Sequence, residues 1–176
     1  MHPDRHPAAS ELLSLRAQGR RQDCVEAKLR VRERKHPKLY WVDPGLVRAI
    51  KKRYGPVSAE ERGALLEGWV LTLLRTYAEE RELYDEIFYW SPTQLSNVEV
   101  DLLLQRGRRF LAIKVKSQSR YSTSMLSGLR AIGELPKIER RILLYGGTRS
   151  VTTSDGIDVW PIKRLIAAIE DDELWP

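Results

Sequence analysis

The sequence predicts an α/β domain with a central mixed sheet flanked by helices. Three observations predict this class: a long amphipathic helical segment that begins near residue 59, three strand-like segments that follow it, and a further alternation of helical and strand-like segments up to the C-terminus. The predicted order is α-β-β-β-α-β plus a terminal strand and helix. The 176 residues suffice for one core. We expect residues 35–176 to form this domain and residues 1–34 to form a basic, partly disordered N-terminal arm.

The first elements are predicted from turn and capping residues. Residues 38–46 resemble a short apolar strand stopped by a Pro-Gly turn and followed by a basic helical turn over residues 51–53. Ser58 with Glu61 three residues later forms a capping-box pattern, which predicts a helix over residues 59–80. Glu67 falls on the packed flank of this helix, where a carboxylate needs a partner.

Three strand-like segments follow, and we expect them to form an antiparallel meander. They cover residues 83–90, 98–104 and 109–115.

The C-terminal part alternates between helical and strand-like patterns. We expect a helix over residues 124–135, a strand over 141–145 and a strand over 157–160, the last followed by a helix that begins with Pro161. The apolar face of this helix is expected to comprise Ile162, Leu165, Ile166 and Ile169.

The positive charge is concentrated in the N-terminal third of the chain. Residues 1–62 carry fifteen Lys/Arg against eight Asp/Glu, whereas residues 63–176 carry fifteen against sixteen, within a net charge of +6. Such a segment can neutralise phosphates of DNA or RNA, although a solvated helix face explains the same pattern equally well. The candidate nucleic-acid-binding residues are Arg30, Arg32, Arg34, Lys35, Lys38, Lys51, Lys52 and Arg53.

Composition argues against several other classes. No apolar run reaches the length of a membrane span, and the N-terminus lacks the apolar stretch of a signal peptide, so we expect a cytoplasmic protein without a membrane partner. The single cysteine, Cys24, argues against a disulfide scaffold and structural zinc.

Charged residues alternate on two neighbouring strands. Glu99 and Asp101 are two residues apart and therefore share one side of the sheet, as do Lys114 and Lys116 on the next strand. If Arg106-Gly107 is a two-residue turn, Glu99 lies opposite Lys114 and Asp101 opposite Ala112, but a slip in register changes these partners. Either register places Lys114 within ion-pair reach of a carboxylate.

This pattern resembles the PD-(D/E)xK nuclease superfamily, which implies a restriction-endonuclease-like core. Glu67 matches the helix acid of that pattern, Asp101 the strand acid and Lys116 the lysine, while Lys114 stands where the superfamily has an acid. The segments around residues 38–46, 66–67, 98–101 and 113–117 together resemble the domain of unknown function 4143, over about residues 35–170. That domain occurs C-terminal to AAA-type ATPases.

The resemblance implies a nuclease site in which Glu67 and Asp101 hold Mg²⁺ or Mn²⁺, with Glu99 as a further candidate ligand, and Lys116 orients the nucleophile. The ammonium group of Lys114 would repel such a metal by several kcal/mol at about 4 Å. We therefore expect a degenerate nuclease-like domain, without a bound cofactor, that associates with nucleic acid and cleaves it weakly or not at all.

Three alternatives stay open. The charges can form a plain cross-strand ion-pair ladder. The chain can be a protein-interaction or regulatory module detached from an AAA-type ATPase. It can also be an active metal-dependent endonuclease in which Glu99 substitutes for the missing ligand, and the sequence does not decide whether Lys114 is natural or introduced.

Overall fold

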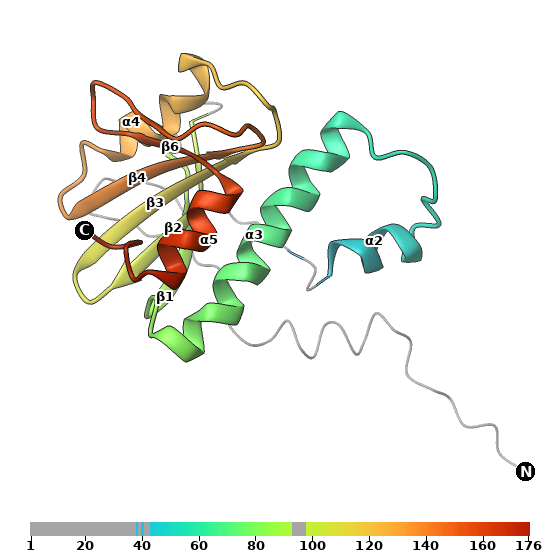
Figure 1. The fold of residues 1–176 in the computed structure, drawn as a ribbon, viewed down its shortest axis with the longest axis horizontal. Helices are drawn as coiled ribbons and strands as arrows, with labels where there is room; N and C mark the ends of the chain where they lie inside the picture. The colour runs from blue at the N-terminus through green and yellow to red at the C-terminus, as the bar shows by residue number, and fades with distance from the viewer. Residues whose placement is uncertain (1–37, 39, 41–42, 93–97) are drawn as a thin grey trace, which may run out of the picture.

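The computed structural model describes residues 38, 40, 43–92 and 98–176, and in this part of the chain a mixed sheet is flanked by helices (Figure 1). The predicted α/β class is confirmed. The predicted N-terminal arm lies outside the described residues. The elements are α2 (Pro44–Ile50), α3 (Ala59–Arg81), β1 (Glu86–Trp90), β2 (Val100–Arg106), β3 (Arg109–Lys116), the 3-10 helix η1 (Thr123–Leu126), α4 (Ser127–Ile132), β4 (Ile138–Tyr145), β5 (Val151–Thr152), β6 (Asp158–Pro161) and α5 (Ile162–Glu170).

The strands follow the order β1-β2-β3-β4-β6-β5 in the described part of the sheet. The first three form the predicted antiparallel meander. Strands β3, β4 and β6 are parallel, so their C-terminal ends meet at one edge of the sheet. The two-residue strand β5 pairs with β6 and was not predicted, because so short a segment carries no periodic signal.

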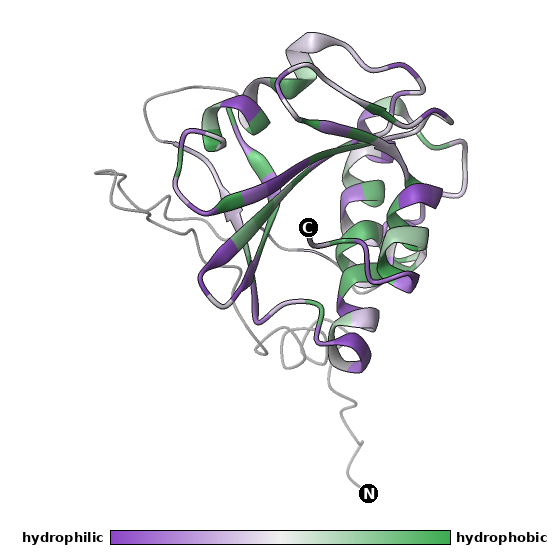
Figure 2. Cartoon of the chain, turned by 60° about the vertical axis from the view of Figure 1, so that its left-hand side comes forward, coloured by the Kyte–Doolittle hydropathy of each residue, from purple (hydrophilic) through white to green (hydrophobic). Residues whose placement is uncertain are grey.

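Helices cover both faces of the sheet. Helices α3 and α5 lie side by side on one face and α4 on the other (Figure 1), and Figure 2 shows hydrophobic positions concentrated on the strands and on the helix surfaces that face them. The α3 face contributes Val70, Leu71 and Leu74 to the core, and the α4 face contributes Leu129 and Ile132. A sheet that is covered on both faces explains why β2 and β3 are almost continuously apolar.

Helix α3 forms where the capping pattern predicts it. The backbone N–H of Glu61 donates to Ser58 Oγ at 3.2 Å, and the helix ends at Glu82, which adopts a left-handed conformation with φ of 46°. The helix includes Glu67 in its third turn and holds this side chain toward the end of the sheet where β2 begins.

The segment before α3 differs from the prediction. Pro44 and Gly45 begin helix α2, because the Asp43 carboxylate caps the first turn by accepting the N–H groups of Gly45 at 2.7 Å and Leu46 at 3.3 Å. Most of the strand predicted before them lies outside the described residues. Proline is well suited to a first helical turn, where its missing N–H has no partner to lose. Lys51 caps the end of this helix, with its N–H donating to Val47 O at 3.0 Å, and Lys52 completes the turn, so the helix lies before the basic residues and not over residues 51–53 as predicted.

The predicted helix over residues 124–135 is also shorter than expected. It divides into η1 and α4, and α4 ends at Ile132 before Gly133. Strand β4 begins at Ile138, earlier than predicted, because its first residues pair with the start of β3. None of the described helices is long and apolar enough to cross a membrane.

Candidate functional site: a lysine–carboxylate cluster

The register of the β2–β3 hairpin sets the position of the candidate site. Arg106 pairs with Arg109, and Gly107, at φ of 60°, supplies the left-handed turn conformation, so the predicted Arg106-Gly107 turn is wrong by one residue. The corrected register sets Asp101 opposite Lys114, so Glu99 is not directly opposite Lys114 and Asp101 is not opposite Ala112, although the side chains of Glu99 and Lys114 still meet.

Asp101 lies where the β2–β3 ladder ends. The last paired residues are Leu102 and Ile113. One step further, the Asp101 carboxylate replaces a backbone carbonyl, because its Oδ2 accepts the backbone N–H of Val115 at 2.8 Å. This hydrogen bond fixes the carboxylate against β3, where Asp101 is only 2 % exposed.

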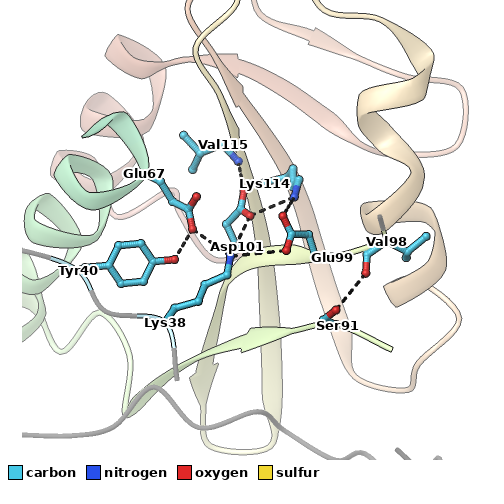
Figure 3. Close-up of polar contacts among 9 residues, drawn as sticks. All are labelled: Lys38, Tyr40, Glu67, Ser91, Val98, Glu99, Asp101, Lys114 and Val115. Carbon is cyan, nitrogen blue, oxygen red and sulfur yellow. Dashed lines mark hydrogen bonds and ion pairs between the residues drawn. The ribbon is translucent and has the colours of Figure 1, made fainter. Parts of the chain in front are cut away.

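Lys114 makes the ion pairs expected from the sequence. Its Nζ lies 3.0 Å from Asp101 Oδ1 and 3.0 Å from Glu99 Oε1 (Figure 3). The Lys114 side chain is buried, and its hydrogen bond to Asp101 is buried with it, whereas the one to Glu99 is partly exposed. A buried ammonium group requires such partners.

A second lysine enters the same group of carboxylates from the segment that precedes α2. Lys38 Nζ lies 3.1 Å from Glu67 Oε1, 3.5 Å from Asp101 Oδ1 and 3.8 Å from Glu99 Oε2 (Figure 3). We refer to Lys38, Glu67, Glu99, Asp101 and Lys114 as the lysine–carboxylate cluster. The sequence assigned Lys38 to a phosphate-binding surface, whereas the structure places its ammonium group among three carboxylates.

Tyr40 completes the contact of this segment with helix α3. Its hydroxyl group donates a hydrogen bond to Glu67 Oε1, the same oxygen that pairs with Lys38. Sequence reasoning did not assign Tyr40 to the site. The available signal was the two-residue spacing of Lys38 and Tyr40, which places both side chains on one side of an extended segment.

Lys38 and Glu99 hold their charges at neutral pH. Desolvation acts to lower the pKa of Lys38, but the carboxylates of Glu67, Asp101 and Glu99 together raise it above its usual value. For Glu99, desolvation acts to raise the pKa, and the ammonium groups of Lys114 and Lys38 outweigh it and lower the pKa. Burial, followed by the Glu67 carboxylate, raises the pKa of Tyr40, which therefore stays a neutral donor.

These residues do not fit a divalent metal ion. Among the residues that the structure describes, no three His, Cys, Asp or Glu side chains form a group that could hold one. The ammonium groups of Lys38 and Lys114 lie between the carboxylates of Glu67, Glu99 and Asp101, and a protonated amine repels a cation instead of ligating it. The arrangement is a set of ion pairs in which three carboxylates face two ammonium groups.

The other predicted site residues lie apart from these ion pairs. Lys116 is half-buried at the end of β3 and helps to lower the pKa of Glu99, but no ion pair joins it to Glu67 or Asp101 in the described structure. Lys51, Lys52 and Arg53 are exposed after α2. The predictions for Arg30, Arg32, Arg34 and Lys35 lie outside the described residues.

The fold and the cluster together define an α/β domain whose mixed sheet ends in a buried group of ion pairs. The model of the family described as Domain of unknown function (DUF4143) matches residues 62–165, and the chain belongs to this family. The match contains Glu67, Glu99, Asp101 and Lys114 and does not extend to Lys38 or Tyr40. No curated protein matches the chain.

Proposed function

We propose that this protein is a degenerate nuclease-like domain that associates with nucleic acid inside the cell and does not cleave it. The observation that carries the proposal is the pair of lysines, Lys38 and Lys114, that occupy the carboxylate group with ion pairs of 3.0–3.8 Å.

Loss of cleavage follows from the chemistry of the cluster. Hydrolysis of a phosphodiester at a carboxylate site depends on a divalent cation that polarises the phosphate and lowers the pKa of a water molecule. A fixed ammonium group donates hydrogen bonds but does not generate hydroxide at neutral pH. The carboxylates of Glu67, Glu99 and Asp101 share the two ammonium groups of Lys38 and Lys114, so most of their attraction for a further cation is offset.

Association with nucleic acid is supported by charge. The chain carries a net charge of +6, and its exposed cations include Lys51, Lys52 and Arg53. Contacts with phosphates release counterions, so about six such contacts make affinity fall by several orders of magnitude over a few-fold rise in salt.

The test combines binding and cleavage on the unmodified protein. Fluorescence anisotropy with labelled DNA is expected to show binding that weakens steeply as salt rises. A plasmid-nicking assay in Mg²⁺ and in Mn²⁺ is expected to show no nicking. Cleavage at low enzyme concentration would establish an active endonuclease, and absence of binding at low salt would remove nucleic acid as the partner.

A protein-interaction module is the second candidate, and helix α2 favours it. Leu46 and Ile50 are 42 % and 48 % exposed and Tyr54 is 82 % exposed, which leaves an apolar surface beside the domain. Such a surface is typical of a site for another protein. An AAA-type ATPase is the partner that the family resemblance suggests. Association that persists in high salt would support this candidate, because apolar contacts respond little to ionic strength.

A further inference from the structure

The loops that follow β3 and β4 carry positive charge and no acidic residues. Residues 102–133 and 140–154, which include both strand ends and the loops that follow them, contain no Asp or Glu. The two loops lie together, because the backbone N–H of Gly146 donates to Gln118 O at 2.9 Å. A Cβ added to Gly147 would lie 2.7 Å from Ser119 O, so this approach is close.

Three cations lie at the edge of the sheet where β3 and β4 end, and two of them, Arg120 and Arg149, form no ion pair with an acidic residue that the structure describes, whereas Lys116 acts on the carboxylate of Glu99. Arg120 and Arg149 are exposed in the two loops, and Lys116 lies at the end of β3. Arg130, on the nearby helix α4, is by contrast paired with Asp155 at 2.8 Å. This edge therefore carries unpaired arginine charge, and it adjoins the lysine–carboxylate cluster, since Lys116 is two residues from Lys114 on the same strand.

An aromatic platform lies among these cations. Tyr121 is 36 % exposed and contacts Tyr145 edge-to-face, with ring centroids 6.0 Å apart and an interplanar angle of 79°. Tyr145 is itself fixed, because its hydroxyl group donates to Arg149 O at 2.8 Å and accepts from Arg149 N at 3.1 Å. An edge-to-face contact occupies at most one face of each ring, so a face of Tyr121 is left free of Tyr145.

We propose that this edge binds single-stranded nucleic acid, with a base stacked on Tyr121 and with backbone phosphates contacted by Lys116, Arg120 and Arg149. The inference rests on the proposed association with nucleic acid and assigns its location and strandedness. Single strands are favoured over duplexes because an exposed aromatic ring stacks on unpaired bases, whereas duplex bases stack on one another. The fixed position of Tyr145 reduces the ordering that binding would require.

The experiment measures anisotropy of a labelled oligothymidylate with the full chain, and repeats the titration with the annealed duplex and with inorganic polyphosphate as competitor. The charge variant is Arg120→Gln with Arg149→Gln. Its matched control is Arg75→Gln with Arg108→Gln, which removes one exposed cation on α3 and one in the β2–β3 turn, at the opposite end of β3. The aromatic variants are Tyr121→Ala, Tyr121→Leu and Tyr121→Phe, each checked for folding by circular dichroism.

The charge variant is expected to bind the single strand about tenfold more weakly, with a slope of log affinity on log salt that is smaller by about 1.4. Tyr121→Ala and Tyr121→Leu are expected to bind it about fivefold or more weakly and to keep the polyphosphate affinity, because one stacked base is lost. Tyr121→Phe and the control pair are expected to bind as the unmodified protein does.

Two results overturn the inference by different routes. If the unmodified protein binds nucleic acid but prefers the duplex, or if the edge variants bind as well as their control, the assignment of this edge is wrong while the proposed function stands. If the unmodified protein binds neither strand form, the proposed function itself fails.

Discussion

Lys114 is the residue on which the chemistry of the site depends. Its buried ammonium group is held 3.0 Å from two carboxylates, and removal of one partner from such a group leaves charge uncompensated away from water. The charge of the side chain at position 114 thus decides whether the carboxylates attract or exclude a cation.

Replacing Lys114 with an acid is expected to reverse this preference. Lys114→Glu should unfold at lower temperature than the unmodified protein in EDTA, because losing a buried partner costs about 3–5 kcal/mol and new carboxylate repulsion adds to it. Mn²⁺ should restore part of the loss. Thermal unfolding with and without Mn²⁺, together with titration calorimetry, measures both effects.

Lys163→Glu is the control for this change, since it reverses one exposed charge on α5. It should respond to Mn²⁺ as the unmodified protein does. Equal response of Lys114→Glu and Lys163→Glu to Mn²⁺ would show that Lys114 does not exclude the metal.

The ion pairs also predict how stability depends on pH. The pKa of Glu99 is lowered in the folded state, so its contribution is present above its unfolded pKa, near 4, and declines as pH falls through the folded pKa. The pKa of Lys38 is raised, so its contribution is present below its unfolded pKa, near 10, and declines as pH rises through the folded value.

We therefore expect a stability plateau between about pH 5 and pH 10 that falls at both ends. Urea unfolding across this range measures it. Lys38→Met should weaken the alkaline decline, because it removes the group that deprotonates there. An alkaline decline of equal size in Lys38→Met would assign that decline to other groups.

At the scale of elements, helix α4 holds the start of β2 in place through a glycine. A Cβ added to Gly128 would lie 2.1 Å from the backbone oxygen of Glu99, so the helix can approach the strand only without a side chain there. This approach positions Glu99 beside Lys114.

Gly128→Ala is expected to lower the free energy of unfolding by about 1–3 kcal/mol, because helix and strand must separate. Gly63→Ala in helix α3 is the control: a Cβ at Gly63 meets nothing within 4 Å, and alanine favours the helix by about 1 kcal/mol. Chemical denaturation of both variants should therefore give shifts of opposite sign. A stabilising Gly128→Ala change would contradict the close approach.

The elements differ in how well the sequence predicts them. Helix α3 is predicted closely, because a capping residue and a long periodic face agree. Helix α2 is missed because the same Pro-Gly pair that ends a strand also begins a helix, and only the capping bond of Asp43 distinguishes the two. The β2–β3 turn is misplaced by one residue because Gly107 can occupy either turn position.

The candidate site is predictable only in part, because a sequence pattern shows which residues of neighbouring strands share a side of the sheet but not which distant segments meet. Lys114 lies near its carboxylates in any register, because both are on adjacent strands and share a side of the sheet. Lys38 reaches Asp101 across 63 positions of sequence, and no local pattern encodes that contact. Tyr40 is missed with it, since both depend on how the segment before α2 lies against α3.

At the scale of the whole molecule, the C-terminus closes the core. Trp175 is buried, and its indole N–H donates to Leu83 O at 2.8 Å just before β1. The guanidinium groups of Arg106 and Arg109 lie 5.9 Å and 5.7 Å from its ring, so the same side chain covers the β2–β3 hairpin. Trp175 thereby joins the last residues of the chain to its first strands.

Trp175→Ala is expected to lower the free energy of unfolding by about 3–5 kcal/mol, because a large buried ring is removed. Trp175→Phe keeps most of the apolar contact and loses the hydrogen bond, so its loss should be smaller, about 1–3 kcal/mol. Urea denaturation followed by circular dichroism measures both. Equal stability of Trp175→Ala and the unmodified protein would show that the C-terminus does not contribute to the core.

Asp101 has two structural roles. It belongs to the lysine–carboxylate cluster, and its Oδ2 accepts a hydrogen bond from Val115 N that extends the pairing of β2 with β3. The sheet alone therefore requires an acid at this position, whatever chemistry the domain performs. Lys114 depends in turn on that acid, because its buried ammonium group would lose a partner without it. An acid at this strand position is thus, taken alone, a poor indicator of cleavage.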